Sequence, residues 1–123
     1  MPRLVRFESE FETEFLAFPE TVRDELLASA DCLPTADCGP QLGRPFVDTL
    51  KGSKHANMKE LRFDAAAGVW RVAFAFDPRR QAILLVGGDK AGVSEKRFYK
   101  QLIAKADMRY TAHLARLKQS TSR

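Results

Sequence analysis

The chain has 123 residues, 45% of them apolar and 29% charged, which is the composition of one globular domain rather than of a disordered chain. No apolar run approaches about 18 residues, and acidic residues rather than an apolar stretch follow the N-terminus, so neither a membrane-spanning helix nor a secretory signal is predicted. The net charge of +4 divides into −6 over residues 1–40 (three basic, nine acidic) and +10 over residues 41–123 (seventeen basic, seven acidic). This division indicates a polyanionic or acidic partner for one face.

The first 18 residues predict a short strand, at 4–7, followed by a helix. Ser9 is placed as the N-cap of that helix, and Glu12 as the residue that completes a capping box. Phenylalanines recur at i, i+4 and i+7, which gives this helix one apolar face: Phe11, Phe15 and Phe18.

A second helix is predicted next, because Pro19 suits a first helical turn and apolar residues recur at every fourth position as far as Ala30. Three prolines and two glycines in residues 34–45 predict a loop. Cys32 and Cys38 lack the spacing of a zinc site and fall short of a disulfide framework, so we expect free thiols in a cytoplasmic protein.

The remainder of the chain predicts a sheet and a long helix. Three antiparallel strands are indicated by their apolar patterns, at residues 58–63, 70–76 and 82–86. Asp77-Pro78 predicts a tight turn between the last two strands. Beyond Ser94, a suitable N-cap, the pattern is helical to about residue 118, and residues 118–123 are expected to be a frayed tail. The order β-α-α-β-β-β-α predicts an α+β fold.

Basic residues gather between positions 51 and 62, in the segment that leads into the first of these three strands. Lys and Arg recognise phosphate through charge and directed hydrogen bonds, and His55 lies within the segment and titrates near neutrality. The plain alternative is a solvated loop, since exposed runs of charge are common.

Arg71 is a sharper candidate. Trp70 and Val72 are expected to point into the core, so Arg71 points to the opposite face, where its strand neighbours Ala73 and Ala75 are small. A guanidinium beside small side chains leaves room for a planar ligand next to a fixed charge. The alternative is an ordinary surface arginine paired with a carboxylate.

Residues 87–92 have the glycine spacing of a phosphate-binding loop, but Val93 stands where that motif requires lysine. Backbone N–H groups of the segment could still face a phosphate, with Lys90 at its tip, although a plain connection is the simpler interpretation. Tyr99 follows near the start of the last helix and is expected close to Lys90, with packing against Ile103 as the alternative.

The blocks at 51–63, 70–77 and 84–90, with the motif E-L-R…W-R-V-x-F-x-F-D and a lysine after the last strand, resemble the RelE/ParE toxin superfamily. The most similar branch is the HigB-like, phage gp49-like group of type II toxin–antitoxin modules. The resemblance covers residues 3–117, which are expected to form a single toxin domain.

This resemblance implies a RelE-like microbial RNase fold with a twisted antiparallel sheet. It implies an mRNA interferase, an endoribonuclease that cuts messenger RNA in the ribosomal A site through attack by the RNA 2′-OH, without metal or cofactor. It further implies a cognate helix-turn-helix antitoxin, with operator DNA bound only through the antitoxin complex. Two alternatives share the fold: a ParE-like toxin that poisons gyrase without cleaving RNA, and a catalytically silent partner of an antitoxin.

Carried over by position, the resemblance also implies roles for individual residues. The implied catalytic residues are Arg71, Lys90, His55, Lys54 and Tyr99. The implied RNA-binding residues are Lys51, Lys59, Arg62, Arg79 and Arg80.

Overall fold

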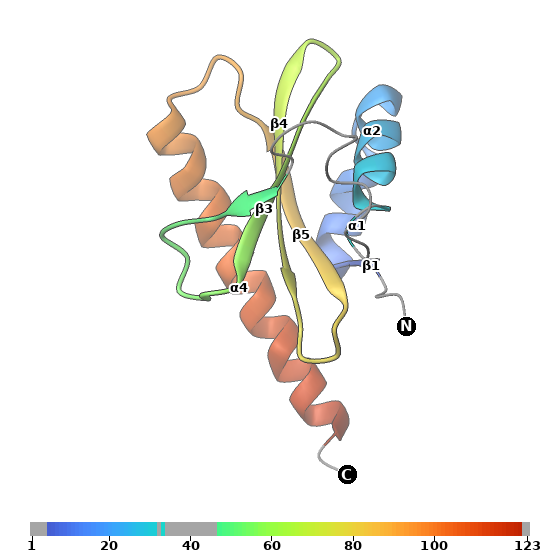
Figure 1. The fold of residues 1–123 in the computed structure, drawn as a ribbon, viewed down its shortest axis with the longest axis vertical. Helices are drawn as coiled ribbons and strands as arrows, with labels where there is room; N and C mark the ends of the chain where they lie inside the picture. The colour runs from blue at the N-terminus through green and yellow to red at the C-terminus, as the bar shows by residue number, and fades with distance from the viewer. Residues whose placement is uncertain (1–4, 32, 34–46, 122–123) are drawn as a thin grey trace.

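The computed structural model describes residues 5–31, 33 and 47–121. Its elements, in chain order, are β1 (Val5–Phe7), α1 (Ser9–Leu16), α2 (Glu20–Ala30), β2 (Val47–Thr49), β3 (Met58–Ala65), β4 (Gly68–Phe76), β5 (Ala82–Asp89) and α4 (Glu95–Thr121). The sheet lies between two helical layers, with α1 and α2 on one face and α4 crossing the other (Figure 1). The predicted α+β layout is therefore confirmed.

The five strands lie in the order β1-β5-β4-β3-β2. As predicted, β3, β4 and β5 form an antiparallel meander. Two edge strands depart from the prediction: β1 pairs with β5 in parallel, and β2 is an additional strand antiparallel to β3. The three residues of β2 are all exposed, so this strand has no apolar alternation that a sequence pattern could detect.

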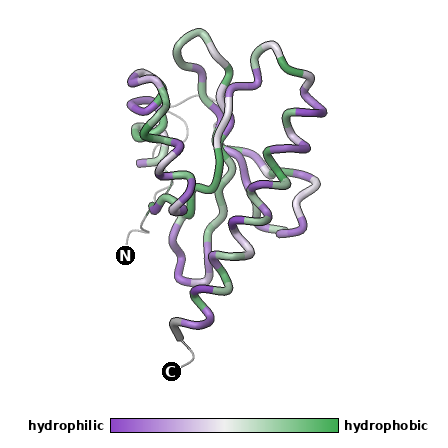
Figure 2. Tube along the Cα trace, turned by 180° about the vertical axis from the view of Figure 1, so that it is seen from behind, coloured by the Kyte–Doolittle hydropathy of each residue, from purple (hydrophilic) through white to green (hydrophobic). Residues whose placement is uncertain are grey.

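Alternation along β4 divides the core into two clusters. Trp70, Val72 and Phe74 pack beneath α1 and α2 with the phenylalanines of α1, whereas Ala73 and Ala75 pack beneath α4. The apolar side of α4 faces the sheet, and hydrophobic and hydrophilic residues alternate along the helix (Figure 2). None of the helices in the described residues is long and apolar enough to span a bilayer.

An arginine network ties α4 to α1. Arg109 is 4% exposed; its Nη1 donates to the Leu85 carbonyl oxygen at 2.8 Å and to a Glu14 carboxylate oxygen at 3.0 Å. The carboxylates of Glu8 and Glu10 lie 3.8 and 3.7 Å from the same guanidinium. Part of the acidic charge of the N-terminal region is therefore neutralised inside the molecule, and the position of α4 against the sheet is fixed.

Three predicted boundaries are wrong. Glu8, not Ser9, caps α1: its carboxylate accepts a hydrogen bond from the Phe11 amide at 2.9 Å, and Ser9 is already helical. Pro19 is the N-cap of α2 rather than part of its first turn, because its ψ of 148° is extended. At the other end of the chain, α4 continues to Thr121, so residues 118–121 do not form the tail expected for them. Cys32, Cys38 and the loop predicted at 34–45 lie outside the described residues.

Candidate active site

The candidate site is built on the α4 face of the sheet around Arg71. In register, Arg71 on β4 lies opposite Arg62 on β3 and Gly88 on β5. The Arg71 side chain is buried, and its Nη1 donates to the Trp70 carbonyl oxygen at 2.9 Å. Like charges directly opposite one another in a sheet reduce stability. The register of the two strands therefore places two positive charges next to each other, an arrangement that favours an anion as their partner.

Tyr99 and Glu60 complete the site from two other elements. The Tyr99 hydroxyl of α4 donates to Glu60 Oε1 at 2.7 Å and accepts from Arg71 Nε at 3.2 Å. Glu60, on β3, is 6% exposed, and its Oε1 lies 3.8 Å from Arg71 Nε. The alternative of an ordinary surface arginine paired with a carboxylate is wrong in its surface position: Arg71 does lie near a carboxylate, but both groups are buried and both contact the Tyr99 hydroxyl.

Burial and the hydrogen bond to Glu60 raise the pKa of Tyr99, although the hydrogen bond from Arg71 opposes them. The phenol therefore stays protonated at neutral pH and acts as a hydrogen-bond donor. Three groups with distinct capacities thus converge: a proton acceptor in Glu60, a proton donor in Tyr99 and a fixed positive charge in Arg71.

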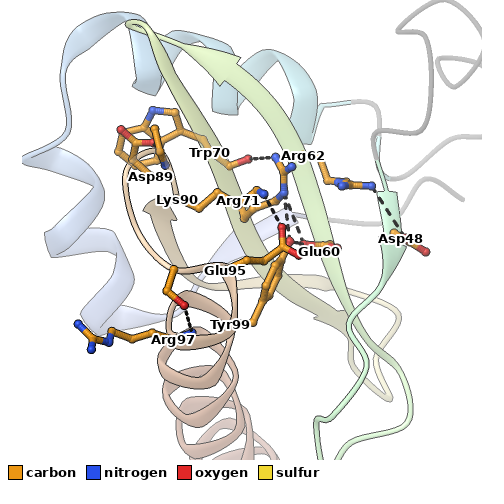
Figure 3. Close-up of polar contacts among 12 residues, drawn as sticks. Asp48, Glu60, Arg62, Trp70, Arg71, Asp89, Lys90, Glu95, Arg97 and Tyr99 are labelled. Atoms are coloured by element: carbon orange, nitrogen blue, oxygen red, sulfur yellow. Dashed lines mark hydrogen bonds and ion pairs between the residues drawn. The ribbon is translucent and has the colours of Figure 1, made fainter.

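Two further basic residues surround this group (Figure 3). Lys90 directly follows β5, and its Nζ lies 2.8 Å from Glu95 Oε1 on the first turn of α4. Arg62 is partly exposed and lies 3.9 Å from Asp48 of β2. Together with Arg71 they form what we call the cation cluster: Arg62, Arg71 and Lys90.

The glycines before Lys90 do not form a phosphate-binding loop. Gly87 and Gly88 belong to strand β5, whose pairing with β4 continues to Asp89. A side chain at Gly88 would begin 3.1 Å from the Phe98 ring, so the missing Cβ there allows α4 to pack closely. The strand pairing and the packing of Gly88 agree with the alternative of a plain connection for these two glycines.

Lys54 and His55 lie away from Arg71. They belong to what we call the basic loop, residues 51–57, which is held against α4 by hydrogen bonds. The Asp107 carboxylate accepts hydrogen bonds from the Ser53 hydroxyl and from the Lys54 amide, the latter at 3.1 Å, and His55 Nε2 lies 3.0 Å from Thr111 Oγ1. These contacts are 8 and 12 residues beyond Tyr99, about 12 and 18 Å along the helix.

The other predicted RNA-binding residues also spread over the molecule. Lys51 is exposed in the basic loop, and Arg79 and Arg80 are exposed in the turn between β4 and β5. Lys59 pairs with Phe74 of the core beneath α1 and α2, so it points to the face opposite Arg71. Of this group only Arg62 lies beside the candidate site.

Glu60 is the residue that the sequence interpretation passed over. A strand alternation that places Met58 on the α4 face also places Glu60 there, two positions on. The alternation therefore predicts the face on which Glu60 lies, but its closeness to Arg71 depends on the register between β3 and β4. Within residues 5–31, 33 and 47–121, no group of three or more His, Cys, Asp or Glu side chains is arranged to hold a metal ion.

Comparisons with known proteins identify the family of this chain and several relatives. The family described as "Phage derived protein Gp49-like" matches residues 13–111. The chain is 47% identical over 83 residues to HigB2 and 56% identical over 77 residues to HigB3, two candidate toxins of Mycobacterium tuberculosis. These matches cover 67% and 63% of this chain but only 41% and 65% of HigB2 and HigB3, less than two thirds of either relative.

A solved structure extends the comparison to the fold. The free state of an Escherichia coli RelE toxin variant, in which two arginines are replaced by alanine, matches with a TM-score of 0.59. The match covers 85% of this chain and 97% of that chain at 12% sequence identity, so it concerns the fold alone.

Proposed function

Since the chain belongs to the Gp49-like family, in the HigB-like group of RelE-fold toxins, we propose that it is a type II toxin that cleaves messenger RNA, most effectively on the ribosome. The observation that carries this proposal is the buried Arg71 held between Tyr99 and Glu60, with Lys90 beside it. A gyrase poison or a silent partner needs no such arrangement of acid, base and positive charge.

These residues match the needs of cleavage by the RNA 2′-OH. In the proposed step the 2′-oxygen attacks the adjacent phosphorus, the bond from phosphorus to the 5′-oxygen breaks, and a 2′,3′-cyclic phosphate and a 5′-OH result. Glu60 accepts the 2′-OH proton, and Tyr99 gives a proton to the leaving 5′-oxygen. Arg71 and Lys90 stabilise the negative charge that develops on the phosphate oxygens. The proton held by Glu60 then passes to the Tyr99 phenolate along the 2.7 Å contact between them, which restores both groups without a metal or a protein nucleophile.

In this proposal Lys54 and His55 bind RNA, whereas the resemblance implied that they were catalytic. About 12 to 18 Å separate their contacts on α4 from Tyr99, which is too far for proton transfer at the same phosphate. We propose instead that the basic loop, together with Arg79 and Arg80, contacts RNA phosphates outside the reaction centre. The ribosomal A site would supply such phosphates, and the cytoplasm is where the protein would meet them.

The proposal includes a helix-turn-helix antitoxin as partner, as the family resemblance implies. That antitoxin would neutralise this chain and carry it to operator DNA. Its binding also provides a test of folding that is independent of RNA cleavage.

The test is induced expression followed by primer extension on a translated transcript. Wild type should arrest growth and produce codon-phased cuts that vanish when translation is blocked. Arg71→Ala should reduce cleavage at least about 100-fold while retaining antitoxin binding, and Arg6→Ala, at an exposed position on β1, should behave as wild type. Loss of DNA supercoiling without RNA cuts would instead establish a gyrase poison, and retained antitoxin binding with neither effect would establish a silent partner.

A further inference from the structure

A carboxylate of the protein itself already pairs with the cation cluster. Glu95, on the first turn of α4, places Oε1 2.8 Å from Lys90 Nζ. Its side chain is 71% exposed, whereas that of Lys90 is 20% exposed. The carboxylate therefore lies at the open side of the site, next to the less exposed Lys90 (Figure 3).

All three members of the cation cluster act on this one carboxylate. The hydrogen bond from Lys90 and its charge lower the pKa of Glu95, and the charges of Arg71 and Arg62 lower it further. A position that three positive charges favour for a carboxylate also favours a phosphate group. In this structure the Glu95 carboxylate occupies that position, beside Lys90.

We propose that Glu95 is an intramolecular competitor for phosphate: its carboxylate occupies the phosphate position of the site, and a substrate phosphate binds only by displacing it. This inference rests on the proposed function for the identity of the substrate. It makes Glu95 an affinity-determining residue, distinct from the groups that carry out the reaction.

Displacement requires only rotation of a side chain. Exposed side chains change rotamer rapidly, and an exposed ion pair contributes little net stability, so Glu95 can leave without movement of α4. Lys90 then pairs with the phosphate in its place. The exchange replaces one anion by another and leaves no buried charge without a partner.

A structural role is the competing interpretation, because an acidic residue in a first helical turn stabilises the helix through its macrodipole. Glu12 offers a matched control, since it is an exposed glutamate in the first turn of α1 and lies on the opposite side of the sheet. Glu95→Gln and Glu12→Gln make the same change of charge, each in the first turn of its helix. Only Glu95→Gln alters the phosphate position.

The experiment titrates inorganic phosphate into the isotope-labelled full chain and follows the amide NMR signals around Gly88. We expect Glu95→Gln to bind phosphate about 5- to 10-fold more tightly than wild type at low salt, as expected for removal of one nearby charge at a partly screened site. Glu12→Gln should stay within about twofold of wild type, and Glu95→Asp, which keeps the charge, should not gain the full increase. Equal phosphate affinity in Glu95→Gln and Glu12→Gln would overturn the inference.

A parallel RNA cleavage assay separates the inference from the proposed function. If Glu95→Gln lowers KM more than it changes kcat, both are supported. Tighter phosphate binding in Glu95→Gln without RNA cleavage by any variant, wild type included, would uphold the inference and refute the proposed function. Cleavage by wild type with unchanged phosphate affinity in Glu95→Gln would refute the inference and leave the function standing.

Discussion

Tyr99→Phe is the substitution that probes the reaction centre with the smallest change of structure. It removes one oxygen atom, and with it the hydrogen bonds of 2.7 Å to Glu60 and 3.2 Å to Arg71. The ring and its packing on the cluster beneath α4 remain. The variant therefore tests the hydroxyl alone.

The expected loss of activity follows from the proposed role of the hydroxyl. Only interactions that are stronger in the transition state than in the resting enzyme change the rate, and here that interaction is the proton transfer from Tyr99 to the leaving oxygen. General acids contribute about 100-fold or more. We expect the cleavage rate of Tyr99→Phe to fall at least about 100-fold.

Tyr110→Phe is the matched control on the same helix. Tyr110 is 2% exposed and donates to the Phe76 carbonyl oxygen at 3.2 Å, about 16 Å along α4 from Tyr99. Both variants lose a hydrogen-bonded hydroxyl, and both should lose about 1 kcal/mol of stability in urea unfolding. Cleavage of a defined RNA by Tyr110→Phe should stay within about threefold of wild type. Equal cleavage by the two variants would refute the assignment of Tyr99 as proton donor.

Three other predictions follow from single contacts. Ala66 and Ala67 form a two-residue turn with φ of 50° and 61°, so Ala66→Asn with Ala67→Gly should raise the unfolding free energy by about 1–2 kcal/mol, and an unchanged melting temperature would contradict this. The hydrogen bond from Arg109 lowers the pKa of Glu14 below 4.5, so the pair stabilises the fold above that pH and loses its effect as the pH falls through the lowered value. Glu14→Gln should therefore be less stable than wild type at pH 7, with the two unfolding curves converging in acid; a constant difference would refute the linkage. His55→Ala should cleave RNA within about threefold of wild type, and a loss near 100-fold would return this residue to the reaction.

Much of the fold could be predicted from the sequence, because strand alternation, helical stripes and short connections all depend on residues that are close together in the chain. The alternation around Arg71 predicted its face correctly, since Trp70 and Val72 are large and apolar and must be buried on the other side. The stripe of α4 predicted a helix across the sheet. Tyr99 was placed near Lys90 because the connection between β5 and α4 is short.

The residues that make up the site were harder to predict from the sequence, because they depend on strand register and on contacts between distant segments. The role of Glu60 emerges only when β3 and β4 are paired, because that register places it opposite Ala73, diagonal to Arg71 and beside the phenol of α4. The position of the basic loop depends on Asp107, a residue more than fifty positions further along the chain. A run of basic residues in the sequence does not show which helix the segment will contact in the fold.

The parallel edge strand illustrates the same limit. Val5 and Phe7 predicted a strand, but its parallel pairing with β5 joins segments more than seventy residues apart, and both side chains pack against the core cluster beneath α1 and α2. Glu14 of α1 likewise pairs with Arg109, and local sequence patterns could not predict this contact because the two residues are 95 positions apart.

The most direct test of the central claim is the fate of the scissile phosphate. A ribosome is programmed with messenger RNA that carries, at the cut nucleotide, either the natural 2′-OH or a 2′-deoxy substitution, and the purified full chain is added. The account predicts that the natural RNA is cut to a 2′,3′-cyclic phosphate and a 5′-OH, and that the substituted RNA is left intact. Cleavage of the substituted RNA at a comparable rate would contradict the assignment of the 2′-OH as nucleophile, and with it the roles of Glu60, Tyr99 and Arg71.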